Sequence, residues 1–296
     1  MKILFMGTPD YAEIILESLI KKYEIIGVYT QPDKPVGRKK TITPPPVKLL
    51  AQKHNIEVFQ PNNLKNEAEN IKKLNPDFIV VAAFGMILPK DILEIAPCIN
   101  LHASLLPKYR GASPIQSAIL NGDKFSGITA MKMDVGLDTG AILAYEYCEV
   151  DNKTAPELFD ELAKIAADLT PYVIDNYEKI EPLKQIDAIA SYSPKIKKED
   201  GEINFDDANK IYRKYLAFYY WPGIFTKKFK LKKIDLIDTI SQNKAGEILE
   251  IKKDSIIVGC QKGSIEIFEV QPHSKKSMNV IAYLNGRGLK VGDNLL

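Results

Sequence analysis

The chain has 296 residues, of which 45% are hydrophobic and 26% are charged, and its formal net charge is +2. This composition is that of a globular protein, and the length is typical of two domains. No segment approaches the roughly 20 consecutive apolar residues that a membrane span needs, and the apolar start meets acidic residues too early for a secretory signal. We therefore expect a cytoplasmic protein with no membrane partner.

The first 190 residues alternate short apolar runs with segments in which apolar residues recur at helical spacing. Strands are predicted at 2–6, 24–30, 77–84, 98–107 and 126–133. Helices are predicted at 46–54, 66–74 and 114–121, and a long one within 154–180. This alternation favours an α/β domain, with a Rossmann-like and mostly parallel sheet between helices. Ligands of such sheets bind beyond the carboxyl ends of the strands.

The pattern changes after residue 190. Residues 191–204 are polar and aperiodic, as in a linker. A short helix around 207–219 follows, and then apolar and polar residues alternate, with turns predicted at Lys253-Asp254 and Lys262-Gly263. We therefore divide the chain into an N-terminal α/β domain over 1–190, a linker over 191–204 and a small OB-like β-barrel over 205–296.

Charge is distributed unevenly between these parts. Residues 1–190 contain 21 Lys and Arg against 25 Asp and Glu, whereas residues 191–296 contain 19 against 13. A basic second part indicates a polyanionic partner, although solvated lysine-rich faces give the same asymmetry.

The three cysteines, Cys98, Cys148 and Cys260, lie far apart and lack the CxxC spacing of a zinc site. We expect core thiols in a reducing compartment, and no metal site.

Three polar residues have the chemistry of an acyl-transfer site. Asn100 and His102 are two apart on a predicted strand, so their side chains share one face. A histidine can relay a proton near neutral pH, an asparagine amide can bind an oxyanion, and an aspartate such as Asp138 can orient the histidine. The alternative is a structural Asn–His pair and an unrelated turn residue, since Asp138 precedes Thr-Gly.

Two motifs contain these residues and resemble those of the folate-dependent formyltransferase family. The first, NLHASLLPKYRG, spans residues 100–111, and the second, MDVGLDTG, spans 133–140. The likeness extends over the whole chain, and QPDKPVGRKK at 31–40 is similar to a basic loop of the tRNA-acting branch. The family more often has Glu where Val135 stands. The resemblance implies formyl transfer from 10-formyltetrahydrofolate to the amino group of methionyl initiator tRNA, with Asn100, His102 and Asp138 as the catalytic residues.

The resemblance also implies a folate site formed by three segments. Its members are Phe84, Gly85, Met86, Ile87 and Leu88; Ser104, Leu105, Leu106 and Pro107; and Val135, Gly136 and Leu137. Such apolar walls and backbone groups can bind a flat heterocycle. A dinucleotide cofactor is not expected, because the first turn, Gly7-Thr8-Pro9-Asp10, lacks the GxGxxG pattern and its Asp repels phosphate.

Basic residues are the candidates for tRNA binding. Arg38, Lys39 and Lys40 lie in a long loop bounded by prolines, and Lys195, Lys197 and Lys198 lie in the linker. Such cations can follow a phosphate backbone, although charged runs are often only solvated. A third group is Lys227, Lys228, Lys230, Lys232 and Lys233, on a predicted hairpin. We expect the neighbouring aromatic run Phe218–Trp221 to pack in the core or between domains.

Two other functions fit parts of this pattern. Sugar-nucleotide N-formyltransferases share both motifs, and their acceptor is an amino sugar. A non-catalytic RNA-binding protein on the same fold is the second alternative, which the joint presence of Asn100, His102 and Asp138 disfavours. We expect a monomer.

Overall fold

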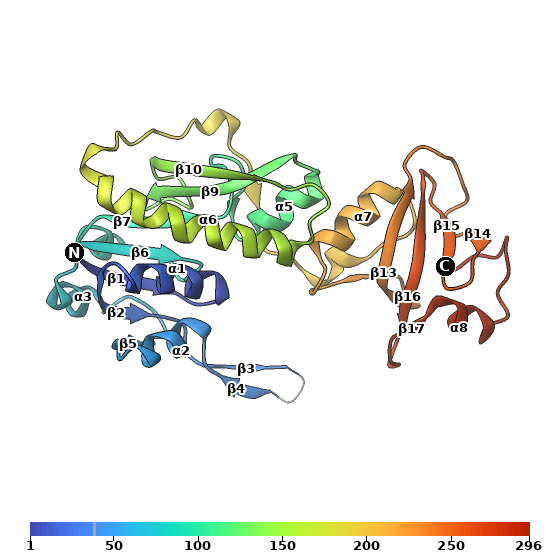
Figure 1. Cartoon of the computed structure of the whole chain (residues 1–296), viewed down its shortest axis with the longest axis horizontal. Helices are drawn as coiled ribbons and strands as arrows, with labels where there is room; N and C mark the ends of the chain where they lie inside the picture. Colours follow the sequence, from blue (N-terminus) through green and yellow to red (C-terminus); the bar gives the residue numbers. More distant parts are fainter. Residues whose placement is uncertain (38–39) are drawn as a thin grey trace. The chain divides into compact units, whose positions relative to one another are not determined.

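The computed structural model describes residues 1–37 and 40–296 (Figure 1). Its contacts divide the chain into two compact units, which we describe separately. The N-terminal unit contains Met1–Pro114, Phe125–Glu149 and Leu158–Pro194, and the C-terminal unit contains Ile115–Lys124, Val150–Glu157 and Lys195–Leu296. The main change of unit thus falls at 194/195, inside the predicted linker, and the predicted borders at 190 and 204 stay predictions.

The N-terminal unit is built on a seven-stranded sheet in the order β10-β9-β7-β6-β1-β2-β5. The strands are β1 (Lys2–Gly7), β2 (Glu24–Tyr29), β5 (Val58–Phe59), β6 (Phe78–Ala82), β7 (Cys98–His102), β9 (Phe125–Lys132) and β10 (Ile142–Glu149). All neighbours from β7 to β5 pair in parallel, whereas β9 is antiparallel to both β7 and β10. The predicted α/β domain with a mostly parallel sheet is confirmed.

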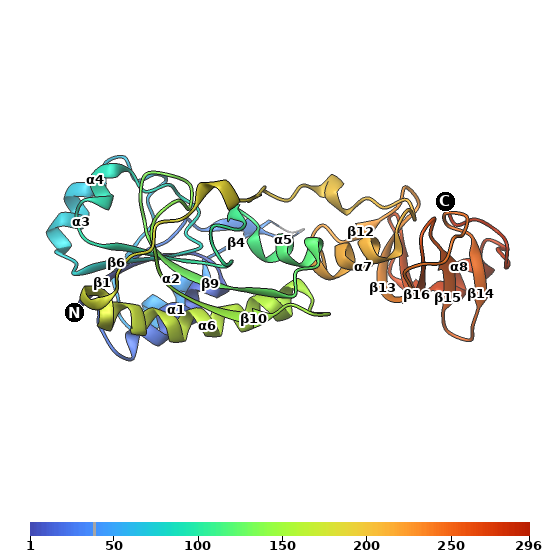
Figure 2. The same ribbon diagram turned by 90° about the horizontal axis from the view of Figure 1, so that it is seen from above.

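Helices cover both faces of this sheet (Figure 2). On one face lie α1 (Asp10–Ile20) and α6 (Ala155–Asn176), which touch where the rings of Tyr11 and Phe159 lie 5.6 Å apart. On the other face α3 (Ala68–Leu74) and α4 (Lys90–Leu93) pack on alternate residues of β1 and β6. Because both faces are covered, every residue of β6 is buried, which explains its continuous apolar sequence.

Two strand predictions in this unit need correction. The strand predicted over 98–107 ends at His102, because the Ser104 carbonyl accepts from the Thr129 hydroxyl at 2.6 Å and the chain turns away. Strand β10 was not predicted, since the middle of this edge strand is exposed and polar and lacks a clear apolar alternation.

The predicted loop around residues 33–43 is partly a hairpin. Its strands β3 (Lys34–Val36) and β4 (Thr41–Thr43) are antiparallel, and α2 (Pro46–Lys53) follows. Positive φ angles at Gly37 (71°) and Lys40 (49°) let the chain reverse. Arg38 and Lys39 lie outside the described residues.

The C-terminal unit combines an antiparallel β-sheet with helices. Its sheet has the order β12-β13-β16-β15-β14, and β17 pairs with β16. The strands are β12 (Ile224–Phe225), β13 (Phe229–Asp238), β14 (Ile248–Ile251), β15 (Ile256–Gly259), β16 (Ser264–Pro272) and β17 (Met278–Asn279). The helices α7 (Ala208–Ala217) and α8 (Val280–Asn285) contact this sheet, and α5 (Pro114–Asn121) lies almost wholly in the unit. The predicted C-terminal β domain is confirmed, including both predicted turns.

Short elements complete the chain. They are β8 (Arg110–Gly111), β11 (Tyr192–Ser193) and 3₁₀ turns at Tyr177–Lys179, Asp187–Ile189 and Lys198–Gly201. All three cysteines are buried. Within residues 1–37 and 40–296, no helix combines the length and apolarity needed to cross a membrane.

Candidate active site

The structure brings His102 and Asp138 together through a loop that folds back over the sheet. Because β9 is antiparallel to β7, the loop after β9 starts beside the first residue of β7, where the Met133 N–H donates to the Cys98 carbonyl at 2.8 Å. The loop then returns, and Asp138 Oδ2 lies 3.7 Å from His102 Nδ1 at the carboxyl end of β7. The two side chains are 7% and 14% exposed, so solvent screens their interaction only weakly.

Hydrogen bonding fixes which nitrogen of His102 carries a proton. Its Nε2 lies 2.9 Å from the carbonyl oxygen of Tyr109, and a carbonyl can only accept. Nε2 is therefore the donor, and in a neutral ring Nδ1 is the nitrogen with a free lone pair. The Asp138 carboxylate lies on the side of that lone pair. A proton placed between His102 Nδ1 and Asp138 Oδ2 would be attracted by both atoms.

Backbone geometry holds the Asp138 carboxylate in place. Asp138 itself has φ +52°, and the Gly111 N–H donates to its Oδ2 at 2.8 Å. Gly111 has φ +117°, and a Cβ there would lie 2.5 Å from the Ser193 carbonyl oxygen. Its position is set by β8, which pairs in parallel with β11. The close approach to β11 therefore requires glycine at 111.

A buried glutamine that the sequence did not single out joins the two motifs. Gln185 is 5% exposed, and its Nε2 donates to the carbonyls of Asp138 (2.9 Å) and Gly140 (2.7 Å). Its Oε1 accepts from Arg110 Nε at 3.0 Å and Nη2 at 2.9 Å. Arg110 is 2% exposed and also donates to Asp187 at 2.8 Å. The polar, aperiodic segment around Gln185 gives no signal for this role.

Asn100 lies on the same strand face as His102, two residues earlier. It is partly buried and pairs with Met131 of β9. Both residues belong to β7, so their side chains share one face, as predicted. The Asn100 amide remains a candidate hydrogen-bond donor to an oxyanion.

The loop after β6 is braced at the carboxyl ends of three neighbouring strands. The Phe84 carbonyl accepts from Thr8 Oγ1 at 3.1 Å and from Gln31 Nε2 at 3.0 Å. Phe84 and Leu88 belong to the core. Gly85 is exposed, Met86 is partly buried and Ile87 is 86% exposed. Of the five residues predicted here, these last three face outward to some degree.

The other two segments of the predicted folate site differ in burial. Ser104 is 1% exposed and donates to the Lys108 carbonyl at 2.6 Å, and Leu106 packs on β9 and β10, whereas Leu105 and Pro107 are half-buried. In the second motif Val135 and Leu137 are 72% and 61% exposed. Large apolar side chains exposed on two loops of one unit are typical of a binding surface.

The predicted cations are exposed where they are described, except Lys230, which is half-buried. Lys40 lies in the turn of the β3–β4 hairpin, and Lys195, Lys197 and Lys198 lie at the start of the C-terminal segment. Among the described residues, no group of three or more His, Cys, Asp or Glu side chains is placed to hold a metal ion.

The chain matches two family models in sequence. Residues 1–174 match the formyl transferase model, and residues 195–288 match the formyl transferase C-terminal domain. The methionyl-tRNA formyltransferase of a Nitratiruptor species is 57% identical over 299 residues, covering 99% of each chain. That of Campylobacter jejuni is 50% identical over 302 residues, again covering 99% of each.

Solved structures show the same fold. The methionyl-tRNA formyltransferase from Clostridium thermocellum has a TM-score of 0.57 and 25% identity, covering 88% of this chain and all of that one. An N-formyltransferase from Helicobacter canadensis, in complex with folinic acid and dTDP-3-aminofucose, has a TM-score of 0.69 at 21% identity, covering 92% of this chain and all of that one. HypX from Aquifex aeolicus, in complex with tetrahydrofolic acid, has a TM-score of 0.67 at 16% identity, covering 99% of this chain and 48% of that one.

Proposed function

The chain belongs to the methionyl-tRNA formyltransferases of the formyl transferase family, and we propose that the His102–Asp138 pair is the centre of its reaction. The enzyme transfers a formyl group to methionyl initiator tRNA and uses a folate co-substrate. The proposal for the reaction centre rests on the geometry of this pair. His102 Nδ1 and Asp138 Oδ2 lie 3.7 Å apart, while His102 Nε2 donates to the Tyr109 carbonyl.

The chemistry requires a proton to move as the amide forms. The lone pair of the methionine nitrogen attacks the formyl carbon of 10-formyltetrahydrofolate, and the carbonyl π electrons move to oxygen. The Asn100 amide donates to that oxyanion. The attacking nitrogen releases its proton to the His102–Asp138 pair, the C–N10 bond breaks, and the pair returns the proton to N10.

We propose that the folate co-substrate lies against the three segments expected to bind it. Support comes from the exposed apolar side chains of Ile87, Val135 and Leu137 and from the backbone of the braced loop after β6. Gly85 has φ +77°, and a Cβ there would lie 2.3 Å from Gln31 Nε2. The backbone at Gly85 can therefore approach a flat ring that larger residues would exclude.

The tRNA is held by cations on both units. Phosphate contacts that carry no sequence information come from Arg38, Lys39 and Lys40 and from the lysines at 195, 197 and 198. We also propose that the enzyme acts in the cytoplasm, because charged tRNA is a cytoplasmic substrate. We propose further that it is a monomer. Light scattering coupled to size exclusion, with and without tRNA, measures the oligomeric state.

Acid gel electrophoresis of charged initiator tRNA incubated with the protein and 10-formyltetrahydrofolate tests this function. We expect formylmethionyl-tRNA to form, and no formylation of a dTDP-linked amino sugar. Turnover of the amino sugar alone would favour a sugar N-formyltransferase. Binding of tRNA without formylation would favour a non-catalytic RNA-binding protein.

A further inference from the structure

A cluster of exposed aromatic side chains follows α7 in the C-terminal unit. Tyr219, Tyr220 and Trp221 are 43%, 81% and 57% exposed, whereas Phe218 is 2% exposed. The expectation of core packing therefore holds for Phe218 alone, and the other expectation, that the run packs between domains, stays a prediction. Only Phe218 is in the core, because the chain turns outward as α7 ends.

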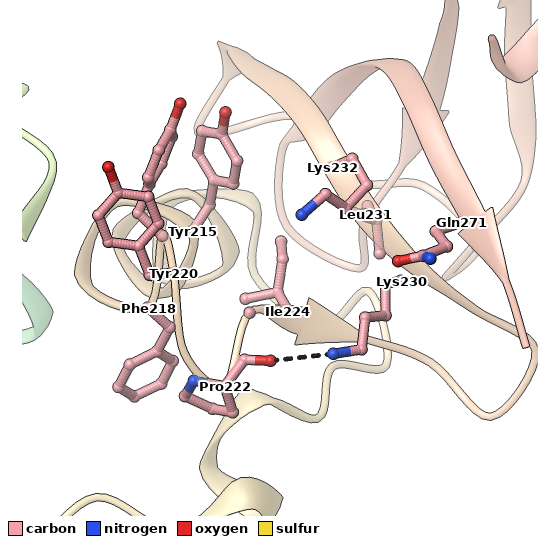
Figure 3. Close-up of a pocket in the computed structure, with 11 residues that line it drawn as sticks. Tyr215, Phe218, Tyr220, Pro222, Ile224, Lys230, Leu231, Lys232 and Gln271 are labelled. Atoms are coloured by element: carbon pink, nitrogen blue, oxygen red, sulfur yellow. Dashed lines mark hydrogen bonds between the residues drawn. The ribbon is translucent and has the colours of Figure 1, made fainter. Parts of the chain in front are cut away.

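Lys230 and Lys232 of β13 line one pocket together with Tyr219 and Tyr220, whereas Trp221 is not among its lining residues (Figure 3). The rings of Tyr215 and Tyr220 lie on the helix side, and Lys230 and Lys232 approach from the strand side. Lys230 Nζ donates to the Pro222 carbonyl at 3.3 Å, which links the strand to the aromatic loop, and Lys232 is exposed. The pocket holds about 50 Å³. That is room for a water or a phosphate oxygen but not for a base, so a base has to lie on the exposed rings.

The charge of the surroundings favours an anionic occupant. From Lys195 to Leu296 the chain has 19 Lys and Arg against 13 Asp and Glu. Burial raises the pKa of the Tyr215 phenol to about 12, with smaller contributions from Tyr219 and Asp235. The phenol therefore stays neutral and does not repel a phosphate. Aromatic faces beside cations are the combination that proteins use to bind unstacked nucleotides.

We propose that Tyr220 and Trp221 form a stacking platform for an unpaired base of the tRNA substrate, with Lys232 binding the adjacent phosphate. The proposal rests on the proposed function for the identity of the RNA. It adds to that function a contact that reads an unpaired base rather than the phosphate backbone alone.

Trp221 is the single tryptophan of the chain, so its fluorescence reports on this site without a label. In the free enzyme we expect acrylamide to quench it as it quenches an exposed indole. Initiator tRNA should quench the emission at saturation. Heparin, a polyanion without bases, should leave the emission unchanged. A shielded indole in the free enzyme would mean that another part of the chain covers the platform. That result, or equal quenching by heparin, overturns the proposal.

Substitutions test the platform independently of catalysis. Loss of one stacked base should weaken tRNA binding roughly 10-fold in Tyr220→Ala, and Tyr220→Phe should restore it. Lys232→Ala should lower the salt dependence of binding by roughly 0.7–1 log–log unit. Tyr172→Ala is the matched control, because Tyr172 is 58% exposed but lies on α6 of the N-terminal unit. If Tyr220→Ala binds tRNA like the control, the platform does not exist, although formylation by the parent would still establish the proposed function.

A second, independent observation concerns Gln185. All four hydrogen-bonding positions of its amide are used inside the fold, two by the carbonyls of Asp138 and Gly140 and two by Arg110. Asp138 has a left-handed backbone, a conformation that costs free energy for a non-glycine residue. We infer that Gln185 is a positioning residue, which sets the direction of the Asp138 side chain toward His102.

Gln185→Glu tests this role with little change in volume. The carboxylate can still accept from Arg110 but cannot donate to either carbonyl. A displacement of about 1 Å at a catalytic group can cost about 100-fold in rate, so we expect kcat to fall 10- to 100-fold with KM for tRNA unchanged. The pH at which kcat is half-maximal should also shift.

Asp187→Ala is the matched control for Gln185→Glu. Asp187 also binds Arg110, but it is 79% exposed and touches neither carbonyl, so kcat and its pH profile should stay near those of the parent. If Gln185→Glu lowers thermal stability while kcat and the pH profile match the parent, Gln185 serves the fold only and the inference is wrong.

Discussion

The His102–Asp138 cluster and the aromatic–lysine surface of the C-terminal unit are built in opposite ways. In the cluster the side chains are almost fully buried, and each is held by backbone groups such as the Tyr109 carbonyl and the Gly111 N–H. At the surface, Tyr220 and Lys232 are exposed. The difference indicates that the chemistry depends on fixed geometry, whereas binding of the large acceptor is the sum of many contacts that are individually weak.

The largest effect should follow removal of either member of the buried pair. His102→Ala and Asp138→Ala each remove the group that exchanges the proton, so we expect kcat to fall about 10²–10⁴-fold. Single-turnover formylation measures this, and the dissociation constants for folate and tRNA should change little. His54→Ala, an exposed histidine at the end of α2, should match the parent. Turnover near that of the parent in either variant would remove that residue from the mechanism.

Asn100 tests the oxyanion side of the same cluster. Asn100→Ala removes one donor to the developing negative charge, and such losses cost about 10²–10³-fold in kcat. Asn100→Asp should be no better, because its carboxylate has no N–H and repels the oxyanion. A loss of less than fivefold in Asn100→Ala would show that another group binds the oxyanion.

The basic residues proposed to bind tRNA should behave in the contrasting way. Replacing Arg38, Lys39 and Lys40 together with alanine, or Lys195, Lys197 and Lys198 together, should raise KM for tRNA. Each lost contact should reduce the log–log salt slope by at most about 0.7–0.9. Folate affinity and kcat at saturating tRNA should stay unchanged. A triple variant that formylates tRNA like the parent over a range of salt would show that its cations are only solvated.

The smallest effect is expected at the base of the β3–β4 hairpin. Hydrogen bonds from Gln60 and then from Lys48 lower the pKa of Asp33. A lowered pKa means that the contribution is present above the ordinary carboxyl pKa and is lost as pH falls through the lowered value. Hydrogen exchange of the hairpin amides should therefore be faster in Asp33→Asn at pH 7, and the two proteins should converge in strong acid. Equal exchange at pH 7 would show that Asp33 does not anchor the hairpin.

The fold class and most of the helices and strands follow from local sequence patterns. Strands such as β1 and β6 are covered on both faces and so read as unbroken apolar runs, and the helices show apolar residues at helical spacing. The prediction that Asn100 and His102 share a face follows from the period of a strand, which local sequence fixes. The two motifs were likewise visible as continuous segments.

The contacts between residues that are distant in sequence could be found only in the folded structure. Asp138 reaches His102 because β9 is antiparallel and its loop folds back, and no local pattern encodes that return. Gln185 lies 75 residues after Arg110, and it hydrogen-bonds both to Arg110 and to the backbone of the second motif. The exposure of Tyr220 and Trp221 was also hidden, since an aromatic run reads the same whether it is buried or facing solvent. Periodicity reports what is near in sequence, whereas these contacts depend on the pairing and crossing of whole elements.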